Sequence, residues 1–90
     1  MLTSTQFIVQ NETIIQKEID EMIETISSNL ESGFFRRELS LCYAPIGAAS
    51  FVAFKVQQRL ASSGWHCEIN LDENCRQIEF IVSPDLSRLV

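Results

Sequence analysis

Side chains that bind metal ions or act as nucleophiles gather near the end of this 90-residue chain. The only histidine, His66, stands beside Cys67, and Cys75 follows shortly after. A structural zinc site needs four Cys or His ligands that converge on one ion. Because successive side chains of a strand point to opposite faces, His66 and Cys67 diverge, and Cys75 falls in the turn beyond them. We therefore expect no metal site, no disulfide and no cofactor in this segment.

Nucleophilic catalysis would need a thiolate beside a base, and Cys42 with His66 is the pair that the sequence offers. Both residues lie on the polar side of their predicted strands, where Glu38, Glu68 or Glu79 could orient the imidazole. An open sheet face, however, has no pocket that excludes water from a reaction. The sequence therefore favours a protein that is not an enzyme.

Glu68 and Glu79 are predicted to face each other across a hairpin. Like charges at directly opposite positions repel each other unless a cation lies over them. We expect Arg36, Arg37, Arg76 or a basic group of a partner to supply that counter-charge.

Two arginines, Arg36 and Arg37, follow a pair of phenylalanines at the exit of the first predicted helix. They suggest an alternative function, in which the chain binds an anion, a nucleotide or a nucleic acid with these arginines and the polar sheet face, and with Lys55 and Arg59 nearby. Arginines at a helix C-terminus also complement the helix dipole without any ligand. The net charge of -5 disfavours nucleic acid as a partner, because phosphate neutralisation needs clustered cations. Backbone N–H groups in the turn YAPIGAAS are a second candidate anion site.

An acidic helix is predicted over residues 11–32, because apolar residues recur there every three or four positions. This stripe consists of Ile15, Ile19, Met22, Ile26 and Leu30. Asn11 is a plausible N-cap and Gly33 a plausible stop. Thr3 and Gln6 could instead form a capping box that starts the helix earlier, whereas residues 1–10 are otherwise expected to be disordered.

A strand is predicted over residues 37–43, where apolar and polar residues alternate, and a second helix over residues 46–63. Gly64 ends this helix, and Trp65 then packs back on Leu60. The helix has two apolar sides, since Phe51 and Phe54 point away from its regular stripe. We expect the stripe to cover a sheet and the two phenylalanines to meet the first helix or another subunit.

A hairpin is predicted over residues 65–71 and 76–82, followed by a tail over residues 84–90 that forms a helical turn capped by Ser83 or frays. The favoured register places Ile69 opposite Ile78. The order αβαββ indicates a single α+β domain with a small, mostly antiparallel sheet, one face of which is covered by helices. We expect the first strand to lie beside the third.

The chain shows no signal-peptide pattern and no apolar run long enough to cross a membrane, and its three cysteines suit a reducing compartment, so we expect a cytoplasmic protein. The helix ending LASSGW and the amphipathic hairpin look like parts of many small bacteriophage or accessory proteins. We expect a protein-interaction or assembly module, homodimeric or bound to another protein, with no membrane partner. Its expected interface consists of Ile15, Ile19, Met22, Ile26, Leu30, Phe51 and Phe54.

Overall fold

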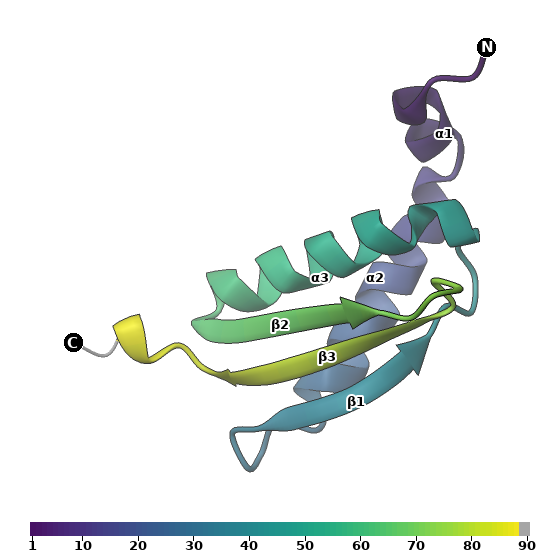
Figure 1. Cartoon of the computed structure of the whole chain (residues 1–90). Coiled ribbons are helices and arrows are strands. Elements are labelled where there is room, and N and C mark those ends of the chain that lie inside the picture. Colours follow the sequence, from purple (N-terminus) through teal and green to yellow (C-terminus); the bar gives the residue numbers. More distant parts are fainter. Residues whose placement is uncertain (89–90) are drawn as a thin grey trace.

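The computed structural model describes residues 1–88 and confirms the α+β class. Figure 1 shows the elements along the chain. In order, they are α1 (Ser4–Gln10), α2 (Glu12–Ser27), β1 (Phe35–Ser40), the 3-10 turn η1 (Ile46–Ala48), α3 (Ala49–Ser62), β2 (Trp65–Leu71), β3 (Gln77–Pro84) and the 3-10 turn η2 (Leu86–Arg88).

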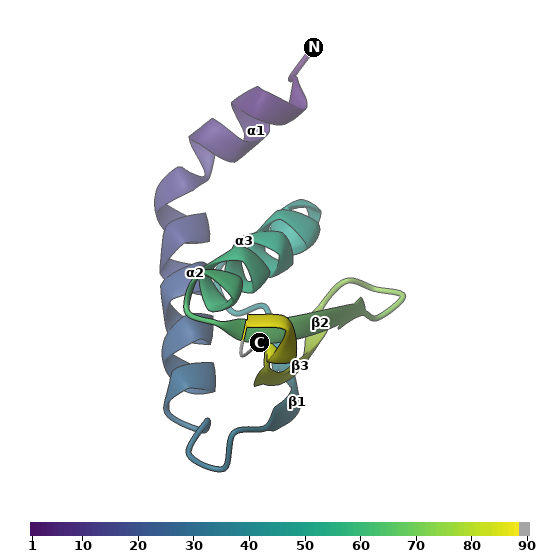
Figure 2. The same ribbon diagram turned by 90° about the vertical axis from the view of Figure 1, so that its left-hand side faces the viewer.

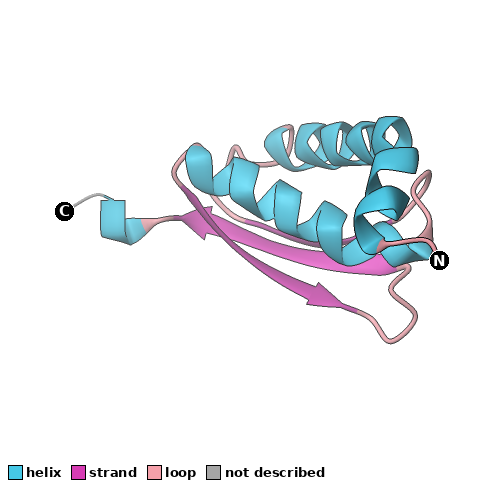
Figure 3. Cartoon of the chain, turned by 90° about the horizontal axis from the view of Figure 1, so that it is seen from above, coloured by secondary structure: helices cyan, strands magenta, loops and turns pink. Residues whose placement is uncertain are grey.

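The three strands form an antiparallel sheet in the order β1-β3-β2, so the expected neighbourhood of the first and third strands is confirmed. Helix α3 runs along β2 and α2 lies beside α3, so that both helices close the same face of the sheet (Figure 3). The core between helices and sheet is apolar, as burial of such surface is the main driving force of folding. Its fully buried side chains include Ile26, Val52, Val56, Ile78, Phe80 and Val82.

The N-terminal segment is helical, and of the two predicted alternatives the structure has the earlier start. Thr3 caps α1 with the predicted capping box: its hydroxyl accepts the N–H of Gln6, and the Gln6 side chain accepts the N–H of Thr3. Asn11, with φ -107° and ψ 13°, then interrupts the helix before α2 begins at Glu12. Asn11 thus stands at the N-cap position of α2, but its side chain donates to the Phe7 carbonyl and makes no cap hydrogen bond to α2. Helix α1 projects from the rest of the molecule at an angle to α2 (Figure 2).

Helix α2 ends at Ser27, before the predicted boundary at residue 32. Serine and asparagine compete for backbone hydrogen bonds at its end, since the amide of Asn29 donates to the carbonyl of Thr25 at 2.7 Å. The chain then turns, and Gly33 adopts a φ of +80° that suits a residue without a Cβ. As a result β1 begins at Phe35 and ends at Ser40, earlier than the predicted strand over residues 37–43.

The second predicted helix is confirmed as η1 followed by α3, and it stops where expected. The N–H of Gly64 donates to the carbonyl of Ala61, and Gly64 has a φ of +89°. A left-handed glycine just past the last turn is a common way to end a helix, because it lets the chain reverse without steric cost.

The hairpin has the predicted faces but not the predicted register, because Ile69 lies opposite Phe80 instead of Ile78. Asp72 causes this shift, since its carboxylate accepts the N–H groups of Arg76 and Gln77 and holds a longer turn. Cys75 closes that turn with a positive φ of 55°. A shift of two residues keeps every side chain on its predicted face.

The C-terminal tail differs from the prediction in its cap. Ser83 and Pro84 belong to β3, and the helical turn η2 is capped by Asp85, whose carboxylate accepts the N–H and hydroxyl of Ser87. The end of the predicted tail, residues 89–90, lies outside the described residues.

Candidate functional site

The residues that could have formed a catalytic pair lie at opposite ends of the sheet. Cys42 follows the end of β1, where Ser40 pairs with Gln77, whereas His66 pairs with Ser83 near the other end of β3. At about 3.3 Å per residue, the two sites are roughly 20 Å apart along β3. Cys42 and His66 therefore do not form a nucleophile and base pair in this fold.

Cys67 is a core residue, and its neighbour His66 points to the open face, as the alternation predicts. The Cys67 side chain is buried, whereas His66 is exposed and its Nε2 lies 3.5 Å from a carboxylate oxygen of Glu68. Burial, and secondarily the charge of Glu68, raise the pKa of the Cys67 thiol to about 11. A thiol in this state is a poor nucleophile near neutral pH.

The polar sheet face is organised around Glu79, and the predicted opposition of Glu68 and Glu79 is wrong. The register shift places Ile81 opposite Glu68, while Glu79 lies opposite Glu38 on β1. The predicted counter-charge is present, since Arg36 Nε lies 3.4 Å from Glu79 Oε2. Asn70 donates to the other oxygen of Glu79 at 3.0 Å.

Arg36 and Arg37 do not converge on a common ligand position. As consecutive strand residues they point to opposite faces of β1. Arg36 is engaged by Glu79, and the guanidinium of Arg37 lies 5.4 Å from the centre of the Phe35 ring. A clamp in which both arginines hold one anion is therefore not formed.

The second predicted anion site, in the turn after β1, is filled by the chain itself. Glu18 is buried on α2, and its Oε1 accepts the N–H groups of Cys42 at 2.9 Å, Tyr43 at 2.8 Å and Ala44 at 3.1 Å. Three successive N–H groups around one oxygen resemble an anion-binding nest. This role of Glu18 was not predicted, although a glutamate about one turn after Ile15, on the apolar side of the helix, is a visible signal in the sequence.

Most of the residues predicted to form an interface lie inside the chain's own core. Ile15, Ile19, Met22 and Ile26 are at most 3% exposed, because α2 packs them against α3 and the sheet. They are therefore not available as a dimer seam, which corrects the prediction. The three other predicted residues reach the surface: Leu30 and Phe51 are half-buried, and Phe54 is 49% exposed.

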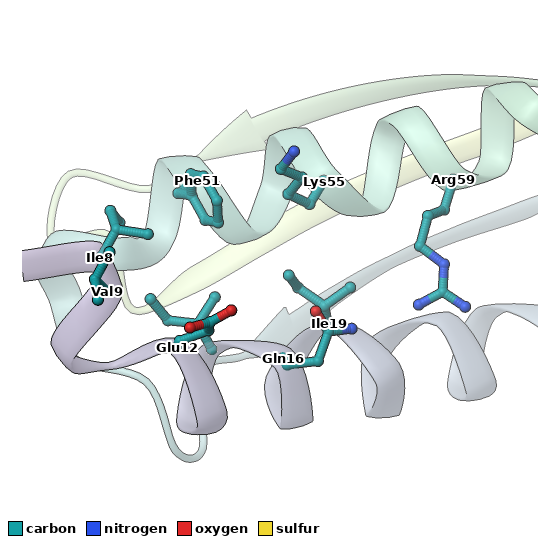
Figure 4. A pocket seen from close by; sticks show the side chains of 9 residues that line it. Ile8, Val9, Glu12, Gln16, Ile19, Phe51, Lys55 and Arg59 are labelled. Atoms are coloured by element: carbon teal, nitrogen blue, oxygen red, sulfur yellow. The ribbon is translucent and has the colours of Figure 1, made fainter. Parts of the chain in front are cut away.

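Phe51 lies in a groove between the α1–α2 bend and α3 (Figure 4). The groove has a volume of about 310 Å³ and a largely apolar lining. Apolar residues from three helices and polar residues from α2 and α3 line it: Ile8, Val9, Glu12, Ile15, Gln16, Ile19, Phe51, Lys55 and Arg59. A concave apolar site with a few polar groups is the usual form of a binding site in proteins.

Two cations lie on the α3 wall of this groove, and they differ in their partners. Arg59 Nη1 lies 2.8 Å from Asp20 Oδ1 and thus ties α3 to α2. The Lys55 ammonium lies 5.4 Å from the centre of the Phe51 ring, a cation–π contact. Among the described residues, Lys55 has no carboxylate within salt-bridge distance.

The ion pair between Arg59 and Asp20 marks the end of this groove. Beyond it, a second hollow of about 300 Å³ continues between α2 and α3, and Arg59 lines both. Leu30, Leu60 and Trp65 lie in the second hollow. The two residues predicted to meet at the end of α3, Trp65 and Leu60, thus line the same surface depression.

Comparison with protein-family models, with curated proteins and with solved structures gives no match for this chain. Within residues 1–88, no helix combines the length and apolarity needed to cross a bilayer. The same residues contain no group of three His, Cys, Asp or Glu side chains placed to hold a metal ion. Its function is therefore inferred from its own geometry.

Proposed function

We propose that this chain is a non-enzymatic module that acts by protein contact and assembles as a homodimer. The observation that carries the proposal is α1, a capped helix without a fully buried residue, of which only Phe7 and Ile8 pack partly against the core of its own chain. A helix of seven residues is far too short to be stable in water without tertiary packing. Such a helix suits an assembly or accessory protein whose surface is completed by a partner.

Uncovered apolar side chains around α1 support the same proposal. Leu2 is 54% exposed and Val9 is 61% exposed. Single exposed apolar residues are normal, but a projecting helix beside an apolar groove presents several of them together. A partner that covers this region would remove that surface from water, at roughly 25 cal/mol for each Å² buried.

The mass of the protein in solution tests the homodimer. Size-exclusion chromatography with light scattering at micromolar concentrations is expected to give twice the chain mass of 10.3 kDa. A mass of one chain at every concentration up to about 100 μM, far above the Kd of a specific dimer, contradicts the proposal.

A further inference from the structure

We propose that the groove between the α1–α2 bend and α3 is occupied by helix α1 of a second copy of this chain. This inference rests on the proposed homodimer and names the segment that forms it. Two copies of a groove-and-helix pair can engage reciprocally about a twofold axis, so that each copy gives one helix and receives one.

Charge selects α1 as the segment that two copies can bring together. Each chain carries a net charge of -5, and the exposed side of α2 is acidic. Its exposed carboxylates are Glu12, Asp20, Glu21 and Glu24. Two α2 helices placed side by side would repel each other. By contrast, the side chains of residues 2–11 carry no charge. The uncharged helix α1 therefore meets less repulsion from its own copy than α2 would.

The groove also offers apolar surface where such a helix needs it. Ile8 and Val9 form one end, and Phe51 lies on the α3 wall (Figure 4). On its other side α1 contacts its own chain through Phe7, whose ring rests on Gly47, 3.3 Å from where a Cβ would lie. The α1 helix of the second copy would cover Phe51 and bury the exposed Val9 of both copies.

Lys55 provides the charge complementarity of this arrangement. It lies one helical turn after Phe51 on α3, is half-buried, and has no carboxylate partner in its own chain within the described residues. In the second copy, Glu12 lies nearly one turn after Val9. Backbone hydrogen bonds continue through the bend at Asn11, so Val9 and Glu12 stay about one turn, roughly 5.4 Å, apart. Val9 of the second copy above Phe51 therefore brings Glu12 of that copy beside Lys55.

The first test replaces an apolar contact and measures the dimer Kd by sedimentation velocity. Val9→Gln is expected to raise the Kd about tenfold or more, because each α1 helix would lose a valine that is buried in the dimer. Ser4→Gln changes an exposed position on the side of α1 away from Val9 and serves as the matched control, with an unchanged Kd. Equal far-ultraviolet circular dichroism of the variants shows that the fold is retained.

The second test distinguishes contacts between copies from contacts within one. Glu12→Lys and Lys55→Glu each place like charges at the proposed contact, and each variant alone is expected to dimerise more weakly than the natural chain. In an equimolar mixture, both contacts of the mixed dimer pair opposite charges, so dimerisation is expected to return. An effect confined to one chain cannot be restored by mixing.

Three outcomes overturn this inference. A natural dimer whose Kd is unchanged by Val9→Gln leaves the proposed homodimer standing and removes α1 from its interface. A mixture of the two charge variants that dimerises no better than either alone removes the contact between Glu12 and Lys55. A natural chain that stays monomeric overturns the homodimer and the groove assignment together.

Discussion

The carboxylate of Glu18, on α2, accepts the backbone N–H of Tyr43 at 2.8 Å, although the two residues are 25 positions apart in the chain. The same oxygen accepts two neighbouring N–H groups, so the path of the chain between β1 and η1 depends on one side chain. This contact ends β1 early, because it turns the N–H groups after Leu41 towards α2 and away from the sheet.

Replacing Glu18 with alanine is expected to lower the free energy of unfolding by about 3 kcal/mol, since it removes charge-assisted hydrogen bonds and leaves donors without a partner. Glu18→Gln keeps an acceptor oxygen and is expected to cost less. Urea denaturation measures both. Glu24→Ala, an exposed change on the same helix, is the control, and an equally large loss there would mean that the loss at Glu18 does not come from these hydrogen bonds.

The buried thiol of Cys67 makes stability depend on alkaline pH. An ordinary thiol ionises near pH 9.0, whereas burial raises the pKa of Cys67 in the folded chain to about 11. Between these values the unfolded chain loses a proton that the folded chain keeps, so stability falls as pH rises, by up to about 1.4 kcal/mol for each pH unit. Chemical denaturation at several pH values above 8 measures this slope. It is expected to diminish in Cys67→Ala and to persist in Cys42→Ala.

Cys75 occupies a backbone conformation that glycine adopts more easily. Its φ of 55° lies in the left-handed region, where a Cβ is crowded. Cys75→Gly is therefore expected to raise the free energy of unfolding by about 1 kcal/mol, while Gly64→Ala, at a φ of +89°, is expected to lower it by a similar amount. Thermal denaturation compares the two. A destabilised Cys75→Gly variant would show that the thiol contributes more than the strain costs.

The ion pair across the groove should be visible in a carboxyl titration. The hydrogen bond from Arg59, followed by that from Gln16, holds the pKa of the Asp20 carboxyl below its ordinary value. A titration followed by nuclear magnetic resonance is expected to show Asp20 ionising at a lower pH than an aspartate without hydrogen-bond partners. Arg59→Gln should raise that pKa. An Asp20 pKa that does not move in this variant would mean that the pair is not formed in solution.

Periodicity and turn chemistry were enough to predict the fold class and the faces of the hairpin. They work because the positions of Ile78, Phe80 and Val82 must all face the core, whatever the exact pairing. The register escaped prediction because it depends on a side chain, Asp72, that holds two backbone N–H groups of the turn.

The candidate site was harder to predict than the fold. The apolar stripe of α2 suggested an interface, but a stripe has the same period whether it packs on its own sheet or on a partner. Only the structure shows that Ile15 and Ile19 are buried in the core of their own chain. The groove depends on the bend at Asn11 and on the distance between α2 and α3. Neither of these can be predicted from the periodicity of a short stretch of sequence.

The bend at Asn11 separates two helices, α1 and α2, that follow each other directly in the chain. The Asn11 N–H donates to the carbonyls of Phe7 and Ile8, its own carbonyl accepts from Ile15, and its side chain donates to Phe7, so hydrogen bonding passes through the bend almost without a break. If this one residue became helical, α1 and α2 would straighten into a single rod from Ser4 to Ser27, roughly 36 Å long at 1.5 Å per residue. Helix α1, with Phe7, would then move away from Gly47. The shape of the groove thus depends on the backbone conformation of a single residue, Asn11.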